Sequence, residues 1–465
     1  MLCSYWQRIH PETPLFRSFS SFNMLARFAF ENLKRRPSLL GVRRRPRSLF
    51  DNAQQQPRHL SSLRQSETDN EACDELPSYV AELVKEYASM DQTPFSLQML
   101  MRSGRGEYLS HQTPTSLTAD LATDEQILIQ VASLLREEIP IRLAYRIQDL
   151  DQIPILRDME AVQRVKKIYI DSLLALLNIP SISSKREEEN FAFILEDLYA
   201  KHSGVLVQMA RGAYQLRAAV RKGEIKGILE NEDSELEFER MHLCHNFLDR
   251  FYTSRIGIRV LAGQYLALRG EATSNYIGMI HLNTSPSAIV RKAADDARMM
   301  CIRQYDNAPR VDIIGQLDLT FPYIPTYLHY ILLELLKNAM RATAERHSDR
   351  GLLPPVTVVI ADGKDNEDVV IKIMDEGGGI PRSQVNKIWS YLFTTADAAV
   401  QDGFIGELDH DDKAPIAGLG YGLPISRSYV RYFGGELDLM SMEGYGTDAF
   451  IHLKRLGDSK EPLPV

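Results

Sequence analysis

Cysteine is scarce in this chain, which has only four among 465 residues, at positions 3, 73, 244 and 301. They stand far apart, so the sequence has neither the closely spaced pairs that bind zinc nor the dense pattern of a disulfide-rich domain. We therefore read Cys3, Cys73, Cys244 and Cys301 as free thiols in a reducing compartment.

Long hydrophobic runs are also lacking. No uninterrupted apolar stretch reaches the roughly 20 residues that a membrane-spanning helix needs. The formal net charge is −8, which argues against general nucleic-acid binding as the main task. A length of 465 residues with 44% hydrophobic residues suits a globular protein of two or three domains, at about 150 residues a domain.

Two signatures of common phosphate-transferring enzymes are absent as well. The chain contains no Walker A loop ending in Gly-Lys-Ser/Thr and no His-Arg-Asp catalytic loop. These absences argue against P-loop enzymes and against ordinary eukaryotic protein kinases.

Acidic residues are nearly missing from the N-terminal stretch, where Glu12 and Glu31 are the only acids through Phe50. Many arginines, serines and scattered aromatic residues occupy the same stretch. This composition is typical of a mitochondrial presequence, so we predict a presequence over residues 1–60 and a linker over residues 61–76. The alternative is a basic arm that binds RNA or lipid.

Apolar residues recur at helical spacing from Pro77 onward, and no convincing strand pattern appears before Pro309. We predict a helical (four-helix) bundle over residues 77–306. The spacing predicts helices over residues 78–90, 127–147, 161–177, 191–216 and 241–268, and Pro140 is expected to end or kink the second of them.

Strand patterns begin after Pro309, where apolar residues alternate with polar ones. The predicted strands are residues 311–314, 356–360, 369–374, 436–441 and 449–453. They alternate with helices, which predicts a mixed, largely antiparallel sheet covered on one face by helices. The fold class is therefore α+β, with the second domain over residues 307–457 and a C-terminal tail over residues 458–465.

One predicted helix of the second domain carries three polar side chains suited to binding. Glu334, Asn338 and Arg341 are three or four residues apart, so they lie on one helix face. Carboxylate and amide oxygens are magnesium ligands, and arginine neutralises phosphate charge. Taken alone, the pattern fits a magnesium–phosphate site and an ordinary amphipathic helix equally.

Three glycine-rich stretches follow this helix. Asp375 ends a predicted strand just before Gly377–Gly379, where its carboxylate can accept a hydrogen bond from an adenine amino group. Alternate glycines at 418, 420 and 422 open an amphipathic helix, whose N-terminus and backbone amides favour an anion. Thr447 lies beyond a turn at residues 444–446, within reach of the same nucleotide.

A long acidic segment, residues 394–418, lies between two of the glycine stretches. Loops of this length in a compact domain are usually functional or disordered. We predict that this one is a lid over the nucleotide, and the alternative is a plain surface insertion.

The order of these stretches resembles the nucleotide-binding boxes of the GHKL superfamily, which includes gyrase and histidine kinases. The chain is similar, more closely, to the mitochondrial protein kinases that inactivate 2-oxoacid dehydrogenase complexes. The motifs that carry this resemblance are REEIPIRLA (136–144), FLDRFYTSRIGIR (247–259), ELLKNAMRAT (334–343), DEGGGI (375–380), AGLGYGLPISRSYVRYFGG (417–435) and MEGYGTDA (442–449). RLGDSKEPLP (455–464) resembles the plant-type pyruvate dehydrogenase kinases, and NAPRV (307–311) resembles the branched-chain enzyme.

This resemblance implies a GHKL (Bergerat) α/β sandwich that binds ATP, with Glu334 as general base and Asn338 as a magnesium ligand. Lys337 and Arg341 would steady the transferred charge. The other nucleotide contacts that it implies are Asp375, Gly377, Gly379, Thr394, Thr395, Gly418, Leu419, Gly420, Tyr421, Gly422, Leu423 and Thr447.

The implied function is an ATP-dependent serine kinase of the mitochondrial matrix that acts on the α-subunit of pyruvate dehydrogenase. The alternatives are a branched-chain 2-oxoacid dehydrogenase kinase, an ATP-gated clamp or chaperone, and a catalytically silent ATP-binding scaffold. The resemblance further implies a potassium ion near the nucleotide, a lipoyl domain bound by the helical bundle and a homodimer formed through the sheet, with no nucleic-acid partner.

The histidines depart from related patterns. No phosphoacceptor histidine occurs in residues 247–264, and we expect His242 and His245, just before them, to be solvated or to cap a helix. Many animal relatives carry a histidine one turn before the catalytic glutamate, where this chain has Tyr330. The adjacent His329 faces about 100° away on a helix, which puts a Glu–His pair in doubt. His202 resembles a histidine in the bundle of family members, and a satisfied structural histidine is the alternative.

Overall fold

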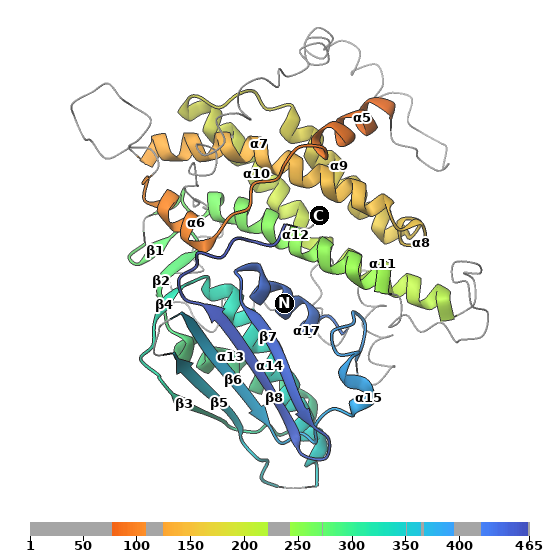
Figure 1. The fold of residues 1–465 in the computed structure, drawn as a ribbon, viewed down its shortest axis with the longest axis vertical. Helices are drawn as coiled ribbons and strands as arrows, with labels where there is room; N and C mark the ends of the chain where they lie inside the picture. The colour runs from red at the N-terminus through yellow and green to blue at the C-terminus, as the bar shows by residue number, and fades with distance from the viewer. Residues whose placement is uncertain are drawn as a thin grey trace.

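The protein is described from a computed structural model, which describes residues 77–107, 124–221, 242–271, 273–349, 351–363, 367–394 and 420–463. The predicted presequence, the linker and nearly all of the predicted lid lie outside these residues. Figure 1 shows a helical half and a half built on a β-sheet, which lie against each other. This arrangement confirms the predicted α+β class.

The helical half is built around long helices that pack against one another: α7 (Asp124–Asp151), α9 (Glu160–Leu177), α10 (Lys185–Lys201), α11 (Val205–Arg221) and α12 (His242–Leu266). The short helices α5 (Ser78–Tyr87), α6 (Leu97–Gly104) and α8 (Pro154–Arg157) flank them. The apolar residues at helical spacing, such as Leu135, Val165 and Leu261, are fully buried between the helices. The predicted helical bundle is therefore present.

Pro140 neither ends α7 nor separates two helices, so that prediction is wrong in part: the helix is continuous from Asp124 to Asp151. A proline inside a helix removes one backbone hydrogen bond and costs about 3 kcal/mol. Here Pro140 and its neighbours Ile139 and Leu143 are buried in the core of the bundle. We attribute the continuity of the helix to this packing, which offsets the local cost.

The predicted helix over residues 191–216 is divided in two. A 3₁₀ turn, η2 (His202–Gly204), separates α10 from α11, and both His202 and Gly204 are buried in it. The capping box of Ser184 and Glu187, which begins α10, lies before the predicted start of this helix.

A small antiparallel sheet joins the two halves and was not predicted. It is formed by β1 (Tyr276–Ile277), β2 (Ile280–Thr284) and β4 (Phe321–Tyr323), in the order β1-β2-β4. Two of its strands precede Pro309, within the region that was expected to be all helical. Strands of two to five residues are too short to show a clear alternation of apolar and polar positions.

The second half contains a five-stranded sheet in the order β3-β5-β6-β8-β7. Its strands are β3 (Val311–Gly315), β5 (Val356–Asp362), β6 (Asp368–Asp375), β7 (Glu436–Met442) and β8 (Gly446–Lys454), so all five predicted strands are confirmed. Only β3 and β5 pair in parallel, and the other neighbours are antiparallel. Helices α13 (Pro286–Tyr305), α14 (Pro325–Arg346) and α17 (Gly422–Tyr432) cover one face, as Figure 1 shows.

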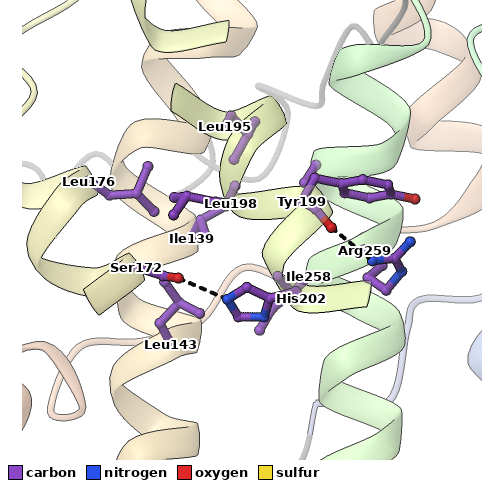
Figure 2. A pocket seen from close by; sticks show the side chains of 11 residues that line it. Ile139, Leu143, Ser172, Leu176, Leu195, Leu198, Tyr199, His202, Ile258 and Arg259 are labelled. Atoms are coloured by element: carbon purple, nitrogen blue, oxygen red, sulfur yellow. Dashed lines mark hydrogen bonds between the residues drawn. The ribbon is translucent and has the colours of Figure 1, made fainter. Parts of the chain in front are cut away.

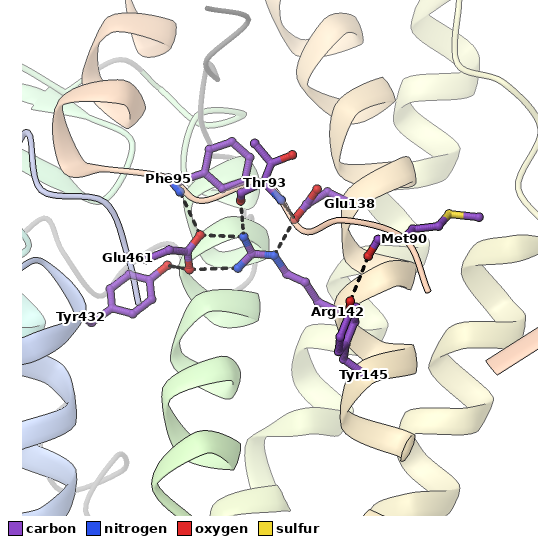
Figure 3. A network of polar contacts seen from close by, with 8 residues as sticks. All are labelled: Met90, Thr93, Phe95, Glu138, Arg142, Tyr145, Tyr432 and Glu461. Carbon is purple, nitrogen blue, oxygen red and sulfur yellow. Dashed lines mark hydrogen bonds and ion pairs between the residues drawn. The ribbon is translucent and has the colours of Figure 1, made fainter. Parts of the chain in front are cut away.

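The end of the chain connects the two halves through a buried charge network (Figure 3). Glu461 accepts hydrogen bonds from Arg142 of α7 at 2.6 and 3.0 Å and from the Tyr432 hydroxyl of α17 at 2.6 Å. Burial opposes the charge of Arg142, but Glu461 and Glu138 raise its pKa above the usual value, so it stays protonated. The network fixes α17 to the bundle.

Two further expectations concern the described residues. Cys244 and Cys301 are both free and buried, and burial raises the pKa of Cys244 to about 11. Cys3 and Cys73 lie outside the described ranges. Among the helices that are described, none is long and apolar enough to cross a bilayer.

Candidate nucleotide-binding site

Helix α14 brings the three predicted polar side chains to one cavity. Its apolar positions, among them Leu332, Leu336 and Ala339, pack into the core. Glu334, Asn338 and Arg341 occupy the other face and line a cavity of about 800 Å³. The predicted common face is therefore confirmed, and its residues meet open space instead of a second apolar layer.

Glu334 lies against the start of α17. Its Oε1 accepts a hydrogen bond from Lys337 Nζ at 2.5 Å, and the two side chains form an ion pair along the helix. A Cβ atom at Gly422 would lie only 2.3 Å from Glu334 Oε2. Because glycine has no Cβ, the carboxylate in this position reaches the helix N-terminus, where an anion is favoured.

Asp375 ends β6 and also lines the cavity. Its Oδ1 accepts hydrogen bonds from the backbone N–H of Gly377 at 2.8 Å and of Thr447 at 3.3 Å. Burial, with a smaller contribution from nearby Asp448, raises the pKa of Asp375 to about 6, although the two hydrogen bonds lower it. A half-buried carboxylate with that pKa is ionised at neutral pH and can accept a hydrogen bond from a ligand.

Most of the predicted site residues line this cavity: the predicted base Glu334 and the predicted nucleotide contacts Asn338, Arg341, Asp375, Gly377, Gly379, Thr394, Gly420, Gly422, Leu423 and Thr447. Tyr421 is an exception, because its side chain is fully buried against the rings of Tyr252 and Tyr391. Any contact of Tyr421 with a nucleotide would come from its backbone. Thr395, Gly418 and Leu419 lie outside the described residues.

One wall of the cavity was missed by the sequence analysis. Helix α13 contributes Met300, Arg303, Gln304 and Tyr305, and α14 adds Glu345, which accepts a hydrogen bond from the Tyr305 hydroxyl at 2.6 Å. The spacing of the apolar residues in α13 predicts an amphipathic helix. It does not predict which part of the fold the polar face of that helix will contact. The clue available in the sequence was an arginine and a glutamine next to each other near the end of a helix.

Comparison with known proteins agrees with this geometry. A family model for mitochondrial branched-chain alpha-ketoacid dehydrogenase kinase matches residues 94–281, and one for histidine kinase-, DNA gyrase B- and HSP90-like ATPases matches residues 324–456. The mitochondrial pyruvate dehydrogenase (acetyl-transferring) kinase of Arabidopsis thaliana is 41% identical over 84% of this chain and 99% of its own. This chain belongs to the mitochondrial 2-oxoacid dehydrogenase kinase family.

Two more relatives extend the comparison. The corresponding kinase of Schizosaccharomyces pombe is 34% identical over 82% of this chain and 98% of its own length. Human isozyme 4 is 34% identical over 77% of this chain and 86% of its own. The family resemblance inferred from the motifs is therefore confirmed.

The histidines of this kinase differ from expectation at one position. His245 is buried, accepts a hydrogen bond from the Tyr391 backbone N–H at Nδ1 (3.3 Å) and stacks on the Tyr391 ring. The expectation that it is solvated or a helix cap is wrong, because His245 lies inside α12 and Tyr391 packs on it. His242 is exposed at the start of α12.

Just before Glu334 on α14, His329 and Tyr330 point to different neighbours. His329 Nε2 lies 3.0 Å from Asp296 Oδ2 on α13, and His329 does not line the cavity. The ring centroids of Tyr330 and Tyr429 lie 5.3 Å apart. Burial, followed by the nearby charge of Glu334, raises the pKa of Tyr330 well above the usual value. Its phenol therefore stays protonated beside Glu334.

His202 lines a second, much smaller pocket inside the bundle of this kinase (Figure 2). The pocket measures about 30 Å³, and its walls are mainly apolar, with Ser172, Tyr199 and Arg259 as polar members. His202 Nε2 lies 2.9 Å from Ser172 Oγ. Burial, followed by the charges of Arg255 and Arg259, lowers the pKa of His202 to about 3, so the ring is neutral at physiological pH.

The donor set of the large cavity fits magnesium in one particular way. The described residues contain no group of three or more His, Cys, Asp or Glu side chains that could hold a metal by themselves. Asn338 and Glu334 offer an amide and a carboxylate oxygen to the cavity. Magnesium is commonly bound through one or two protein oxygens, with phosphates and waters completing the shell. The residues therefore fit a magnesium ion that arrives with the nucleotide.

Proposed function

We propose that this chain is a protein-serine kinase of the mitochondrial matrix that uses Mg-ATP to phosphorylate, and so inactivate, the α-subunit of pyruvate dehydrogenase. The observation that carries the proposal is the placement of Glu334 and Asn338, one turn apart on α14, in the same cavity as Gly420 and Gly422. An acidic residue, a metal-binding amide and an anion-binding helix start are the parts that phosphoryl transfer needs.

The nucleotide is oriented by its two ends. Asp375 accepts a hydrogen bond from the adenine amino group, and Thr447 and the backbone around Gly377 and Gly379 complete the base pocket. The phosphates lie at the N-terminus of α17, where the amides of Gly420–Leu423 and the helix dipole stabilise negative charge. Asn338 would hold a magnesium ion, which would neutralise charge on the phosphates. The family resemblance also implies a potassium ion near the nucleotide.

Transfer itself needs a base and little further covalent chemistry. Glu334 takes the proton of the substrate serine hydroxyl while the hydroxyl oxygen forms a bond to the γ-phosphorus. The bond from that phosphorus to the β–γ bridging oxygen breaks, and ADP leaves with the electron pair. Lys337 holds Glu334 in place, and Arg341 neutralises charge on the phosphates.

The partners follow from the same proposal. The bundle binds the lipoyl domain of the acyltransferase core, and two copies of the kinase associate through the sheet. The names of the Arabidopsis, fission-yeast and human relatives support pyruvate dehydrogenase as the target. A labelled-ATP assay on the purified α-subunit tests the reaction, and absence of label on serine despite ATP binding would refute it.

A second candidate is a branched-chain 2-oxoacid dehydrogenase kinase, which the model that matches residues 94–281 favours. Initial rates on the two dehydrogenases, measured side by side with the same enzyme preparation, decide between them. If the protein is a clamp or chaperone, it should hydrolyse ATP without any protein substrate. The labelled-ATP assay, run without a dehydrogenase, would then show the release of free phosphate.

A further inference from the structure

A residue next to the nucleotide cavity has an unusual backbone conformation. Leu392 has φ +65°, in the left-handed region that residues other than glycine rarely adopt, and its side chain is only 2% exposed. The two residues that follow, Phe393 and Thr394, line the cavity. A strained residue at such a place persists only where its surroundings hold it.

The group that holds Leu392 comes from the helical bundle. Arg217 of α11 donates a hydrogen bond from Nη1 to the Leu392 carbonyl oxygen at 3.0 Å. Arg217 is itself 4% exposed, and its guanidinium lies over the Tyr214 ring at 5.1 Å. A hydrogen bond from a buried cation is stronger than one between neutral groups, so it can fix the orientation of this peptide.

The peptide between Leu392 and Phe393 also contacts the proposed phosphate-binding backbone, Gly420–Leu423, which we call the phosphate cradle. Gly420 has φ +78°, and a Cβ there would lie 2.4 Å from Phe393 O and 2.7 Å from Leu392 C. The backbone that leads into α17 therefore rests directly on the peptide that Arg217 holds. Rotation of that peptide would displace both Gly420 and Thr394.

Helix α12 holds the neighbouring residues in the same way. The Tyr391 hydroxyl donates a hydrogen bond to Asp249 at 2.6 Å, and the Tyr421 ring packs on Tyr252 at 5.9 Å. Tyr391 and Tyr421 also pack on each other at 5.2 Å. Residues of the helical bundle therefore contact the chain on both sides of the cavity-lining residues, at Tyr391 and Leu392 and at Tyr421.

We propose that Arg217 is a positioning residue for ATP: through the Leu392 carbonyl it holds the peptide on which Gly420 and the phosphate cradle rest. The inference rests on the proposed nucleotide site. It assigns to the bundle a part in building that site, in addition to any protein that the bundle binds. Loss of the hydrogen bond should weaken ATP binding more than it slows transfer from bound ATP.

The test uses the full-length protein with Arg217→Met, which keeps a long apolar stem but removes the donor, and Arg217→Lys, which restores a charged donor. We expect Arg217→Met to raise the KM for ATP about tenfold with a smaller change in kcat, and Arg217→Lys to recover part of the loss. ADP binding, followed by calorimetry and by the fluorescence of Trp389 near the cavity, should weaken in parallel.

A matched control is available in the same bundle. Arg136 of α7 donates from Nε to the Ile179 carbonyl at 2.7 Å, away from the cavity. Arg136→Met should leave the KM for ATP unchanged. An Arg217→Met enzyme with wild-type KM and ADP affinity overturns the inference. If that variant does not fold, wild-type values for Arg217→Gln, which removes the buried cation, overturn it as well. Failure of the wild-type protein to bind ATP would instead refute the proposed site.

Discussion

Lys337 Nζ lies 2.5 Å from Glu334 Oε1, whereas the other carboxylate oxygen of Glu334 faces Gly422 at the start of α17. One oxygen is thus held by a cation on the same helix, and the second points to where the phosphates would lie. Because its two oxygens have different contacts, the Glu334 carboxylate has a fixed orientation before any substrate binds, which is what a general base requires.

The first prediction concerns the charge of Glu334. Glu334→Gln keeps the shape of the side chain but cannot take a proton, so serine phosphorylation should fall by about two orders of magnitude or more. ATP binding, measured by calorimetry, should be retained because the nucleotide contacts remain. Full transfer activity in this variant would contradict the role of Glu334 as base.

The second prediction uses the space at Gly422. Gly422→Ala adds a Cβ that would lie only 2.3 Å from Glu334 Oε2, so the carboxylate must move. We expect kcat to fall at least about tenfold, because small displacements of a catalytic group are costly. Gly351→Ala is the control, because nothing lies within 4 Å of the added atom. Equal activity of the two variants would show that the contact has no catalytic consequence.

The third prediction follows from the raised pKa of Asp375. With a pKa of about 6, this carboxyl is ionised above that pH and protonated below it. A protonated carboxyl loses acceptor capacity for the adenine amino group, so affinity should fall as pH falls, by up to about tenfold per unit below pH 6. Adenosine is the suitable probe, because it has no phosphate that titrates in this range.

Asp375→Asn provides the check on that assignment. An amide does not titrate, so adenosine affinity should be lower than wild type and independent of pH between about pH 5 and 8. A wild-type affinity that does not change across the same range would show that the charge of Asp375 does not contribute to adenine recognition.

The sequence was sufficient for the parts of the site that local patterns encode. The face of α14 follows from residues three and four apart, and the strands of the large sheet follow from alternation, with Val369, Ile371 and Ile373 all buried. Glycines mark the close contacts at Gly420 and Gly422, because a Cβ would lie 2.4 Å from Phe393 O at the first and 2.3 Å from Glu334 Oε2 at the second. In each case the determining residues are neighbours in the chain.

The remaining features depend on residues that are distant in the chain. Arg217 and Leu392 are separated by 175 positions, and Arg142 and Glu461 by 319, so no spacing rule links them. The continuity of α7 through Pro140 likewise depends on tertiary packing, which overrides a local penalty. Burial of His245 follows from its contact with Tyr391 and has no signature within its own helix.

The last prediction tests the buried network at the end of the chain. Glu461→Ala removes a buried carboxylate that forms an ion pair with Arg142. The same carboxylate accepts hydrogen bonds from the Tyr432 hydroxyl and the Phe95 backbone N–H. An uncompensated buried arginine costs about 3–5 kcal/mol, which should appear as a lower free energy of unfolding in urea. The exposed pair of Glu160 and Arg164 is the control, and Glu160→Ala should cost no more than about 0.5 kcal/mol. Similar small losses in both variants would mean that Glu138 alone compensates Arg142, and that the end of the chain does not fix α17 to the bundle.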